Sequence, residues 1–162
     1  MAFVVRPGAE ADIPDMLHLW RKMMDIHAQA DSRFRPRPSP DGEQAWEYHL
    51  REHIFADGDW CVLVAEQDGR LVGHVVGMLT EPYPVFEAGR YGEVMDMVVD
   101  AAARRRGVGK ALFTALKAWF RERGADHLEL RAAHRNLTAQ AFWRAMGCTD
   151  YMDSLWIDLE VE

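Results

Sequence analysis

The chain has 162 residues, of which 49% are hydrophobic, and its formal net charge at pH 7 is −7. This length and apolar content predict a single globular domain, residues 1–162, large enough for its own core. The negative charge argues against a nucleic-acid partner, and no apolar stretch approaches the roughly 18 residues of a membrane span. The opening residues do not read as a signal peptide, so we expect a cytoplasmic protein with no membrane partner.

The first half of the chain predicts one strand, two helices and a hairpin. Apolar residues between Ile13 and His27 recur at helical spacing, and three prolines in the segment that follows prevent this helix from continuing. Asp68-Gly69 is a strong turn signal between two strand-like runs. In chain order, the predicted elements are a strand at 4–7, a helix at 13–27, a loop at 30–42, a helix at 43–55, and strands at 61–65 and 71–79.

The second half predicts alternating strands and helices. The run from Val94 to Val99 is nearly all apolar, which is typical of a strand buried on both faces. In chain order, the predicted elements are a strand at 91–100, a helix at 108–120, a strand at 127–133, a helix at 136–146, and a last strand that holds Trp156, Ile157, Leu159 and Val161. The elements predict a mixed α/β fold in one piece, with a central mixed twisted sheet of about six to seven strands and about four flanking helices.

The segment from Arg104 to Gly109 joins the predicted buried strand to an amphipathic helix. Gly107 and Gly109 lack a Cβ, so the backbone can approach an anion while the unpaired amides of the first helical turn point at it. The segment lacks the Gly-Lys-Ser/Thr ending of a Walker loop and the third glycine of a dinucleotide fingerprint. It predicts a pyrophosphate site; the alternative is an ordinary helix N-terminus with surface arginines.

Two motifs and their order along the chain resemble those of the GNAT superfamily, the acetyl-CoA-dependent N-acetyltransferases. The loop fits the family pattern R/Q-x-x-G-x-G/A, and residues 136–147, NLTAQAFWRAMG, are similar to the family helix N-x-x-A-x-x-F-Y-x-x-x-G. Residues 4–17 are similar to the family's first strand and helix, and residues 71–77 to its third strand. The matching motif residues are Arg104, Gly107, Gly109, Asn136, Ala139, Phe142 and Gly147.

The resemblance implies that acetyl-CoA is the cosubstrate and that no metal takes part. In the family, the two central strands splay apart and pantetheine lies between them, which here means strands 91–100 and 127–133. The thioester is then expected near the backbone of Met97 and the pantetheine amides near Val99. The coenzyme-binding residues that the resemblance implies are Met97, Val98, Val99, Arg104, Arg105, Arg106, Gly107, Val108, Gly109, Lys110, Asn136, Ala139, Phe142 and Trp143.

The implied reaction is direct attack of a primary amine on the thioester. A lysine-like amine has a pKa of about 10.4 and a thiol one of about 8.5, so deprotonating the amine is the heavier task. Glu93 matches the family position of a glutamate that removes this proton through a water, and we take it as the first candidate for general base; a solvated strand end is its alternative. Asp96, Glu81 and Tyr91 are the reserve candidates.

One residue departs from the family pattern. Trp143 stands where the family usually has a tyrosine near the leaving sulfur, and an indole N–H is not a usable acid. Tyr151 or Tyr91 could substitute as general acid, and Trp143 could pack against the acyl group. A thiolate can also take a proton from solvent after it leaves.

Two further functions are weighed against this one. His49 and His53 spell HxxEH on a predicted helix, the pattern of an inverted zinc peptidase, although no third ligand is evident. A catalytically silent acyl-CoA-binding or regulatory domain is the other alternative, because of Trp143. The only cysteines, Cys61 and Cys148, are expected to be buried thiols.

The acceptor is expected to be a small-molecule or peptide amine. The family binds its acceptor beside the loops at 31–41 and 81–89, which here mix arginines with aromatic and acidic residues. The negative net charge is consistent with a cationic amine, but the sequence does not identify it. The sequence also leaves open whether the chain forms a homodimer.

Overall fold

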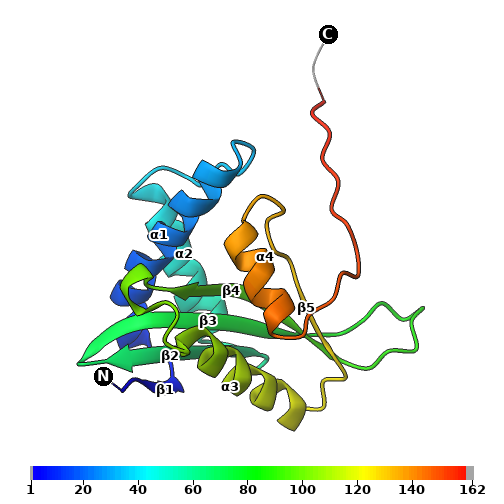
Figure 1. Ribbon diagram of the computed structural model, residues 1–162. Helices are drawn as coiled ribbons and strands as arrows, with labels where there is room; N and C mark the ends of the chain where they lie inside the picture. The colour runs from blue at the N-terminus through cyan, green and yellow to red at the C-terminus, as the bar shows by residue number, and fades with distance from the viewer. Residues whose placement is uncertain (1, 160–162) are drawn as a thin grey trace. The chain divides into compact units, whose positions relative to one another are not determined.

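The computed structural model describes residues 2–159 (Figure 1). The chain divides into two compact units, Met1–Arg131 and Ala132–Glu162. The first unit holds a sheet of five strands, and the second holds one helix and the C-terminal segment. The mixed α/β class predicted from the sequence is confirmed.

The five strands follow one another across the sheet in chain order, which is β1-β2-β3-β4-β5. The first three pairings are antiparallel and the pairing of β4 with β5 is parallel. Asp68 and Gly69 turn β2 into β3 with φ angles of 51° and 74°, as a tight hairpin turn requires. The strands are β1 Val4–Pro7, β2 Trp60–Gln67, β3 Arg70–Thr80, β4 Tyr91–Val99 and β5 Leu128–Leu130.

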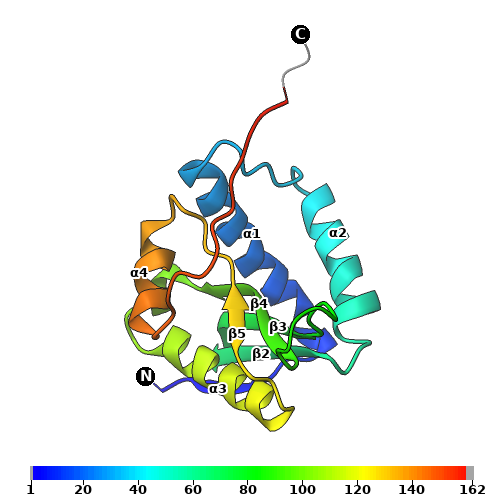
Figure 2. The same cartoon turned by 90° about the vertical axis from the view of Figure 1, so that its right-hand side faces the viewer.

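Helices α1 (Ile13–Ala30) and α2 (Asp41–His49) cover one face of this sheet, and α3 (Val108–Glu122) covers the other (Figures 1 and 2). We call these faces the α1 face and the α3 face. A short 3-10 helix, Glu10–Asp12, precedes α1, and another, Ala101–Ala103, follows β4. In the second unit, α4 spans Leu137–Ala145.

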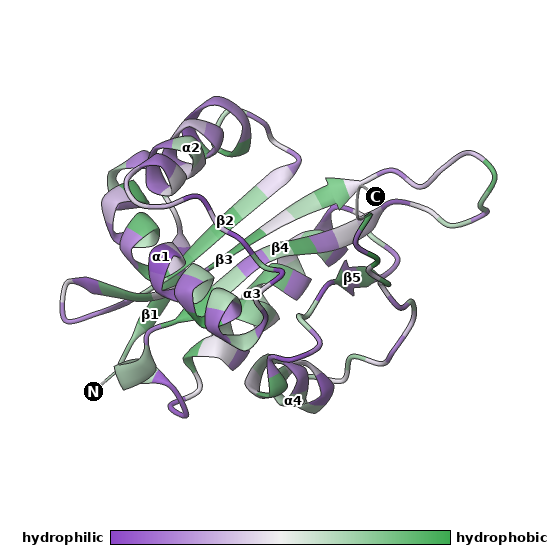
Figure 3. Cartoon of the chain, turned by 90° about the horizontal axis from the view of Figure 1, so that it is seen from above, coloured by the Kyte–Doolittle hydropathy of each residue, from purple (hydrophilic) through white to green (hydrophobic). Residues whose placement is uncertain are grey.

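The core on the α1 face joins the first helix to the central strands, where apolar residues concentrate (Figure 3). One cluster holds Ile13, Met16, Leu50, Ile54, Val62, Val64 and Val76, and a second holds Leu19, Trp20, Met23, Met24 and Val98. On the α3 face, a Cβ added to Gly77 would lie 2.7 Å from the Phe120 ring, so α3 packs against bare backbone there. Within residues 2–159, no helix combines the length and the apolar content needed to cross a membrane.

The structure corrects several sequence predictions. The last strand is absent: residues 151–159 pair with no strand among the described residues, and Leu155, Ile157 and Leu159 are exposed, while Val161 lies outside the described residues. A period-two apolar pattern makes a strand only where another strand offers hydrogen bonds. The sheet therefore has five strands, one or two fewer than predicted.

The other corrections concern lengths and burial. The predicted strand 127–133 is a strand only over Leu128–Leu130. The predicted helix 43–55 begins at Asp41, and its last turn is the π-helix Leu50–Ile54, in which the Phe55 amide donates to the Leu50 carbonyl at 2.8 Å. The predicted strand 91–100 is not buried on both faces along its whole length, because Met95 is exposed.

Candidate active site

A β-bulge in the middle of β4 sets the geometry of the site. Val94 lies opposite Gly77 of β3, and Asp96 lies opposite the next residue, Val76, so Met95 is an extra residue in the ladder. Side chains three apart on a regular strand point to opposite faces. Here the extra residue brings Asp96 back to the face that Glu93 already occupies. Because Val76 belongs to the core cluster of the α1 face, both carboxylates lie on that face.

The edge of β4 opens beyond the bulge. β5 pairs with β4 only at Gly92, Glu93 and Val94. From Met95 to Val99, no strand within residues 2–131 pairs with β4 on the β5 side. The Val99 carbonyl accepts a hydrogen bond from the Arg104 side chain, with Nε at 3.1 Å. The remaining backbone groups of this edge are the ones expected to pair with pantetheine.

The loop after β4 is held in a conformation suited to an anion. Arg105 and Gly107 both have positive φ, 63° and 85°, which is an uncommon conformation for an arginine. Helix α3 begins at Val108, directly after Gly107, and no side chain caps it. No side chain therefore occupies the amides of its first turn, and the pyrophosphate site at residues 104–109 remains a prediction.

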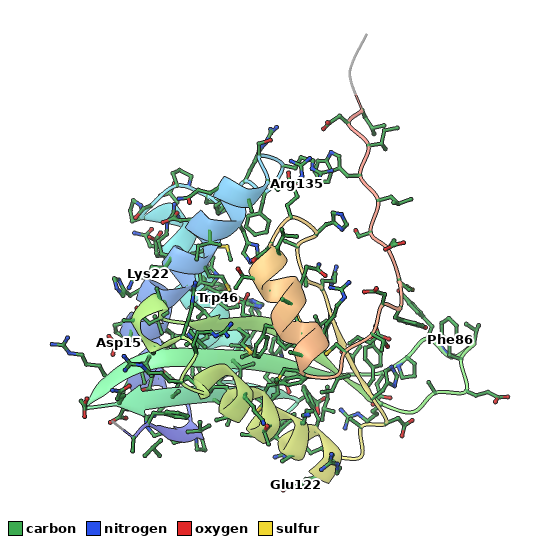
Figure 4. The ribbon with its side chains drawn as sticks, viewed as in Figure 1. Asp15, Lys22, Trp46, Phe86, Glu122 and Arg135 are labelled. Atoms are coloured by element: carbon green, nitrogen blue, oxygen red, sulfur yellow. The ribbon has the colours of Figure 1, made fainter. Side chains whose placement is uncertain are left out.

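A cleft of about 290 Å³ lies between α1 and the end of β4. Lys22 of α1 reaches toward this end of β4 (Figure 4) and forms an ion pair with Asp100, with Nζ and Oδ2 2.8 Å apart. This ion pair lowers the pKa of Asp100, which also accepts a hydrogen bond from the Ala102 amide. The cleft is lined by Leu19, Lys22, Asp25, Ile26, Gln29, Val98, Val99, Asp100, Ala101 and Arg104. Val98 and Val99, whose backbone groups are expected to bind the coenzyme, therefore line the same cleft as Arg104.

At the opposite end of β4, Glu93 already has a charged partner. Arg131 donates to its carboxylate at 3.0 Å, although the Arg131 side chain is itself 84% exposed. Glu93 also lies directly opposite Glu129 of β5, so two carboxylates face each other across the parallel pair. His127 lies 3.3 Å from Glu129 and stacks on Tyr91, with ring centroids 5.2 Å apart. Burial, followed by Glu129 and Glu93, raises the pKa of Tyr91.

Asp96 differs from Glu93 in having no polar partner within the described residues. Within the described residues it makes no hydrogen bond or ion pair, and burial raises its pKa to about 7. A base is most effective when its pKa lies near the working pH. Of the two carboxylates that the bulge brings to the α1 face, Asp96 is therefore the one suited to exchange a proton at neutral pH.

The reserve residue Glu81 and the two predicted acceptor loops also have definite places. Glu81 forms an ion pair with Arg90 at 2.6 Å and is mostly exposed. Phe86 and Tyr83 lie exposed in the loop between β3 and β4, with Phe86 at its projecting end (Figure 4). In the loop after α1, the Arg37 carbonyl accepts a hydrogen bond from Arg21 at 2.9 Å. The acceptor role of these loops remains a prediction.

In the second unit, Asn136 caps its helix. Its side-chain oxygen accepts a hydrogen bond from the Ala139 amide at 3.1 Å, which explains an asparagine at this position by local structure alone. The rings of Phe142 and Trp143 are in edge contact, with centroids 4.9 Å apart. Tyr151 is exposed. The coenzyme role of Asn136, Ala139, Phe142 and Trp143 and the catalytic role of Tyr151 remain predictions.

The two histidines of the HxxEH pattern are neighbours: His49 is the last residue of α2 and His53 lies in the π-helix that follows. The ring centroids of His49 and His53 are 5.0 Å apart, and His49 also lies against the rings of Trp46 and Trp60. Burial, and next the nearby His53, lowers the pKa of His49. Among the described residues, no group of three or more histidine, cysteine or acidic side chains is placed to hold a metal ion. Cys61 is buried as expected, whereas Cys148 is only half-buried, which corrects the expectation of two buried thiols.

Known proteins resemble this chain in sequence. The model of the acetyltransferase (GNAT) family matches residues 20–148. Glucosamine 6-phosphate N-acetyltransferase 1 of Oryza sativa subsp. japonica is 40% identical over 90 residues, which are 54% of this chain and 54% of that protein. The chain thus matches about half the length of this curated relative.

Solved structures share the fold at low sequence identity. A mutant of the BH1408 protein from Bacillus halodurans superposes with a TM-score of 0.82 at 18% identity, over 97% of this chain and 99% of that one. An aminoglycoside antibiotic 6'-N-acetyltransferase from Acinetobacter haemolyticus gives a TM-score of 0.74 at 19% identity, over 98% of this chain and 99% of that one. Both likenesses extend along nearly the whole chain.

Proposed function

Because the chain belongs to the acetyltransferase (GNAT) family, we propose that it transfers the acetyl group of acetyl-CoA to a primary amine of a small molecule or peptide. The observation that carries the proposal is β4, which is bulged at Met95, unpaired beyond it on the β5 side within residues 2–131, and followed by the loop with positive φ at Arg105. These features supply an open backbone edge and an anion cradle on one continuous segment.

The residues present fit acetyl-CoA as the donor substrate. The open amides at the start of α3 suit its pyrophosphate, and the neighbouring arginines of the loop add positive charge. The free edge of β4 between Met95 and Val99 suits the pantetheine amides, because an extended chain can pair with it as an added strand. A backbone N–H of this edge near Met97 would stabilise the oxyanion that develops on the thioester carbonyl.

The geometry favours Asp96 over Glu93 as the group that takes the amine proton. Glu93 is held by Arg131, whereas Asp96 is unpaired within the described residues and has a pKa raised by burial to about 7. We propose that Asp96 accepts one proton of the acceptor ammonium group, directly or through one water, so that the neutral nitrogen can attack the thioester carbon and then release its second proton to solvent. The bond from carbon to sulfur then breaks and the thiolate leaves with its electron pair. No general acid is required, because the thiolate takes its proton from solvent.

The acceptor is proposed to be a cationic amine. The net charge of −7 attracts cations, and Glu93 and Glu129 present two carboxylates on the face that also carries Asp96. The exposed Arg131 neutralises this pair only in part, so an incoming ammonium group could take its place at Glu93. The similar fold of an enzyme named for aminoglycosides, which are polyamines, supports this class without identifying the compound.

A panel of amines tests the proposed function. Purified protein is mixed with acetyl-CoA and single amines from the amino acid, peptide, polyamine and aminoglycoside classes, and free thiol is measured. We expect thiol release above the hydrolysis background with at least one cationic class. If acetyl-CoA binds but no amine in any class accelerates thiol release, the chain is better described as a silent acyl-CoA-binding domain.

The zinc peptidase alternative requires a bound metal, whereas the proposed acetyltransferase does not. We propose that no metal takes part, so a chelator should leave acetyl transfer unchanged and purified protein should hold no stoichiometric zinc. His49→Ala should not change the metal content measurably, because no third ligand lies beside His49 and His53 in the described residues. Elemental analysis that finds one zinc per chain, lost in His49→Ala, would favour the peptidase instead.

A further inference from the structure

One buried polar side chain in the described core serves no evident structural purpose. His74, in the middle of β3, is fully buried, and neither ring nitrogen has a hydrogen-bond partner in the described residues. Unpaired polar atoms in a core destabilise the fold, and an aliphatic residue at this position would avoid that effect. Burial also lowers the pKa of His74 to about 4. At neutral pH the imidazole is therefore uncharged, with one N–H donor and one acceptor nitrogen.

The strand register places His74 beside Asp96. His74 lies opposite Val98 of β4, and Val76, two residues further along β3, lies opposite Asp96. His74 and Asp96 are thus diagonal neighbours on the α1 face, at a backbone separation of roughly 7–8 Å that polar side chains can bridge directly or through a water. The ladder between these two pairs is regular, so the diagonal placement of His74 and Asp96 follows from the alternation of side chains along β3 and β4.

The other carboxylates near this imidazole already have partners. Glu66 of β2 is in an ion pair with Arg6 at 2.9 Å, and Asp100 at the end of β4 is in one with Lys22 at 2.8 Å. Lys22 and Asp25 of α1 line the cleft at the end of β4, where Lys22 is paired with Asp100 and Asp25 with Arg21. The α1 side chains packed against the neighbouring Val98 itself are apolar. These side chains are Leu19, Trp20, Met23 and Met24. Asp96 is the titratable neighbour that remains unpaired within the described residues.

We propose that His74 is a positioning residue for Asp96, and that its neutral imidazole N–H is linked to the carboxylate through one bound water. This inference rests on the proposed role of Asp96 as proton acceptor and extends it to a second residue. A hydrogen bond to the ionised carboxylate favours the form that can accept a proton, and it holds that carboxylate in one orientation. The proposal gives a function, the positioning of Asp96, to a buried histidine whose ring nitrogens otherwise have no hydrogen-bond partner in the described residues.

Nuclear magnetic resonance of the full chain tests the pairing without an activity assay. The carboxyl carbon of Asp96, assigned by its loss in Asp96→Asn, is titrated in the wild-type protein, in His74→Leu and in His74→Gln. Loss of the N–H donor in His74→Leu should raise the Asp96 pKa by about one unit or more. His74→Gln keeps a side-chain N–H and should titrate close to the wild type. An unchanged Asp96 pKa in a folded His74→Leu protein would overturn the pairing.

Asp96→Asn provides a second test of the pairing if His74→Leu does not fold. At pH 8 the imidazole nitrogen shifts of His74 should differ between the wild-type protein and Asp96→Asn, because the N–H partner loses its charge. Equal shifts would also overturn the pairing.

Kinetics separate this inference from the proposed function. In His74→Leu the acidic limb of kcat/KM against pH should move to higher pH by the same amount as the Asp96 pKa, so that activity at pH 7 falls about fivefold for a shift of one unit. If the Asp96 titration moves but the pH profile does not, the pairing stands and the role of Asp96 as base fails.

Discussion

Asp96→Asn should lower kcat for acetyl transfer by about 10²- to 10⁴-fold at pH 7, because an amide cannot take the proton of the attacking amine. Asparagine has nearly the size of aspartate, so the affinity for acetyl-CoA should not change. The measurement is thiol release at saturating acetyl-CoA over a range of pH. As the pH approaches the amine's own pKa of about 10.4, more acceptor arrives neutral, and the variant should recover part of its deficit.

Glu93→Gln is the matched control for this result, since it makes the same chemical change two residues before the bulge. We expect a smaller loss, seen mainly as a higher KM for the amine, because Glu93 is held by Arg131 and is proposed to contact the acceptor cation. A large loss of kcat in Glu93→Gln together with normal turnover in Asp96→Asn would transfer the role of base to Glu93.

Thermal unfolding of the same variant shows whether the loss is chemical or structural. The pKa of Asp96 is raised from 3.8 to about 7 in the folded chain, so its ionisation opposes folding fully above pH 7 and not at all below pH 3.8. Asp96→Asn removes this effect. The variant should therefore melt at a higher temperature than the wild type at pH 8, and the difference should shrink as the pH is lowered toward 4. A lower melting temperature at pH 8 would point to structural damage instead.

Gly109→Trp should abolish the stabilisation of the protein by acetyl-CoA. A ligand at 100 times its dissociation constant stabilises the folded chain by about 2.7 kcal/mol, which for this size is a rise in Tm of about 5 to 10 °C. An indole at the second residue of α3 would fill the space in front of the open amides. Differential scanning fluorimetry with and without acetyl-CoA measures the change.

Gly58→Trp is the control for the added bulk. Gly58 lies on an exposed loop, and a Cβ there meets nothing within 4 Å. This variant should keep the full acetyl-CoA shift. If Gly109→Trp keeps it as well, the pyrophosphate does not bind at the start of α3.

The sequence predicts best those parts whose cause is local. The Asp68-Gly69 turn follows from two residues that tolerate positive φ, and the start of α3 follows from Gly107 at the end of an apolar strand. These two places locate the hairpin and the expected anion site. The open edge of β4 was anticipated only through the family resemblance.

The parts that the sequence does not predict depend on distant partners. The bulge at Met95 lies in an apolar run whose letters do not show which residue is the extra one. The ion pair of Glu93 with Arg131 depends on the parallel register of β5, and it weakens the case for the residue that the family pattern favours. For His74 the sequence shows only a polar residue in an apolar strand. That Asp96 is its neighbour on the adjacent strand follows from the strand register, which the sequence does not give.

Met95 also affects how related sequences should be compared at this site. Adding or removing one residue between Glu93 and Asp96 reverses the face of every later side chain in β4, whereas a change of two residues restores it. A homologue could therefore carry both acids and lack the arrangement, or carry a different spacing and keep it. Whether the number of residues between the two acids of β4 is odd or even is therefore as informative about the site as the identity of the acids.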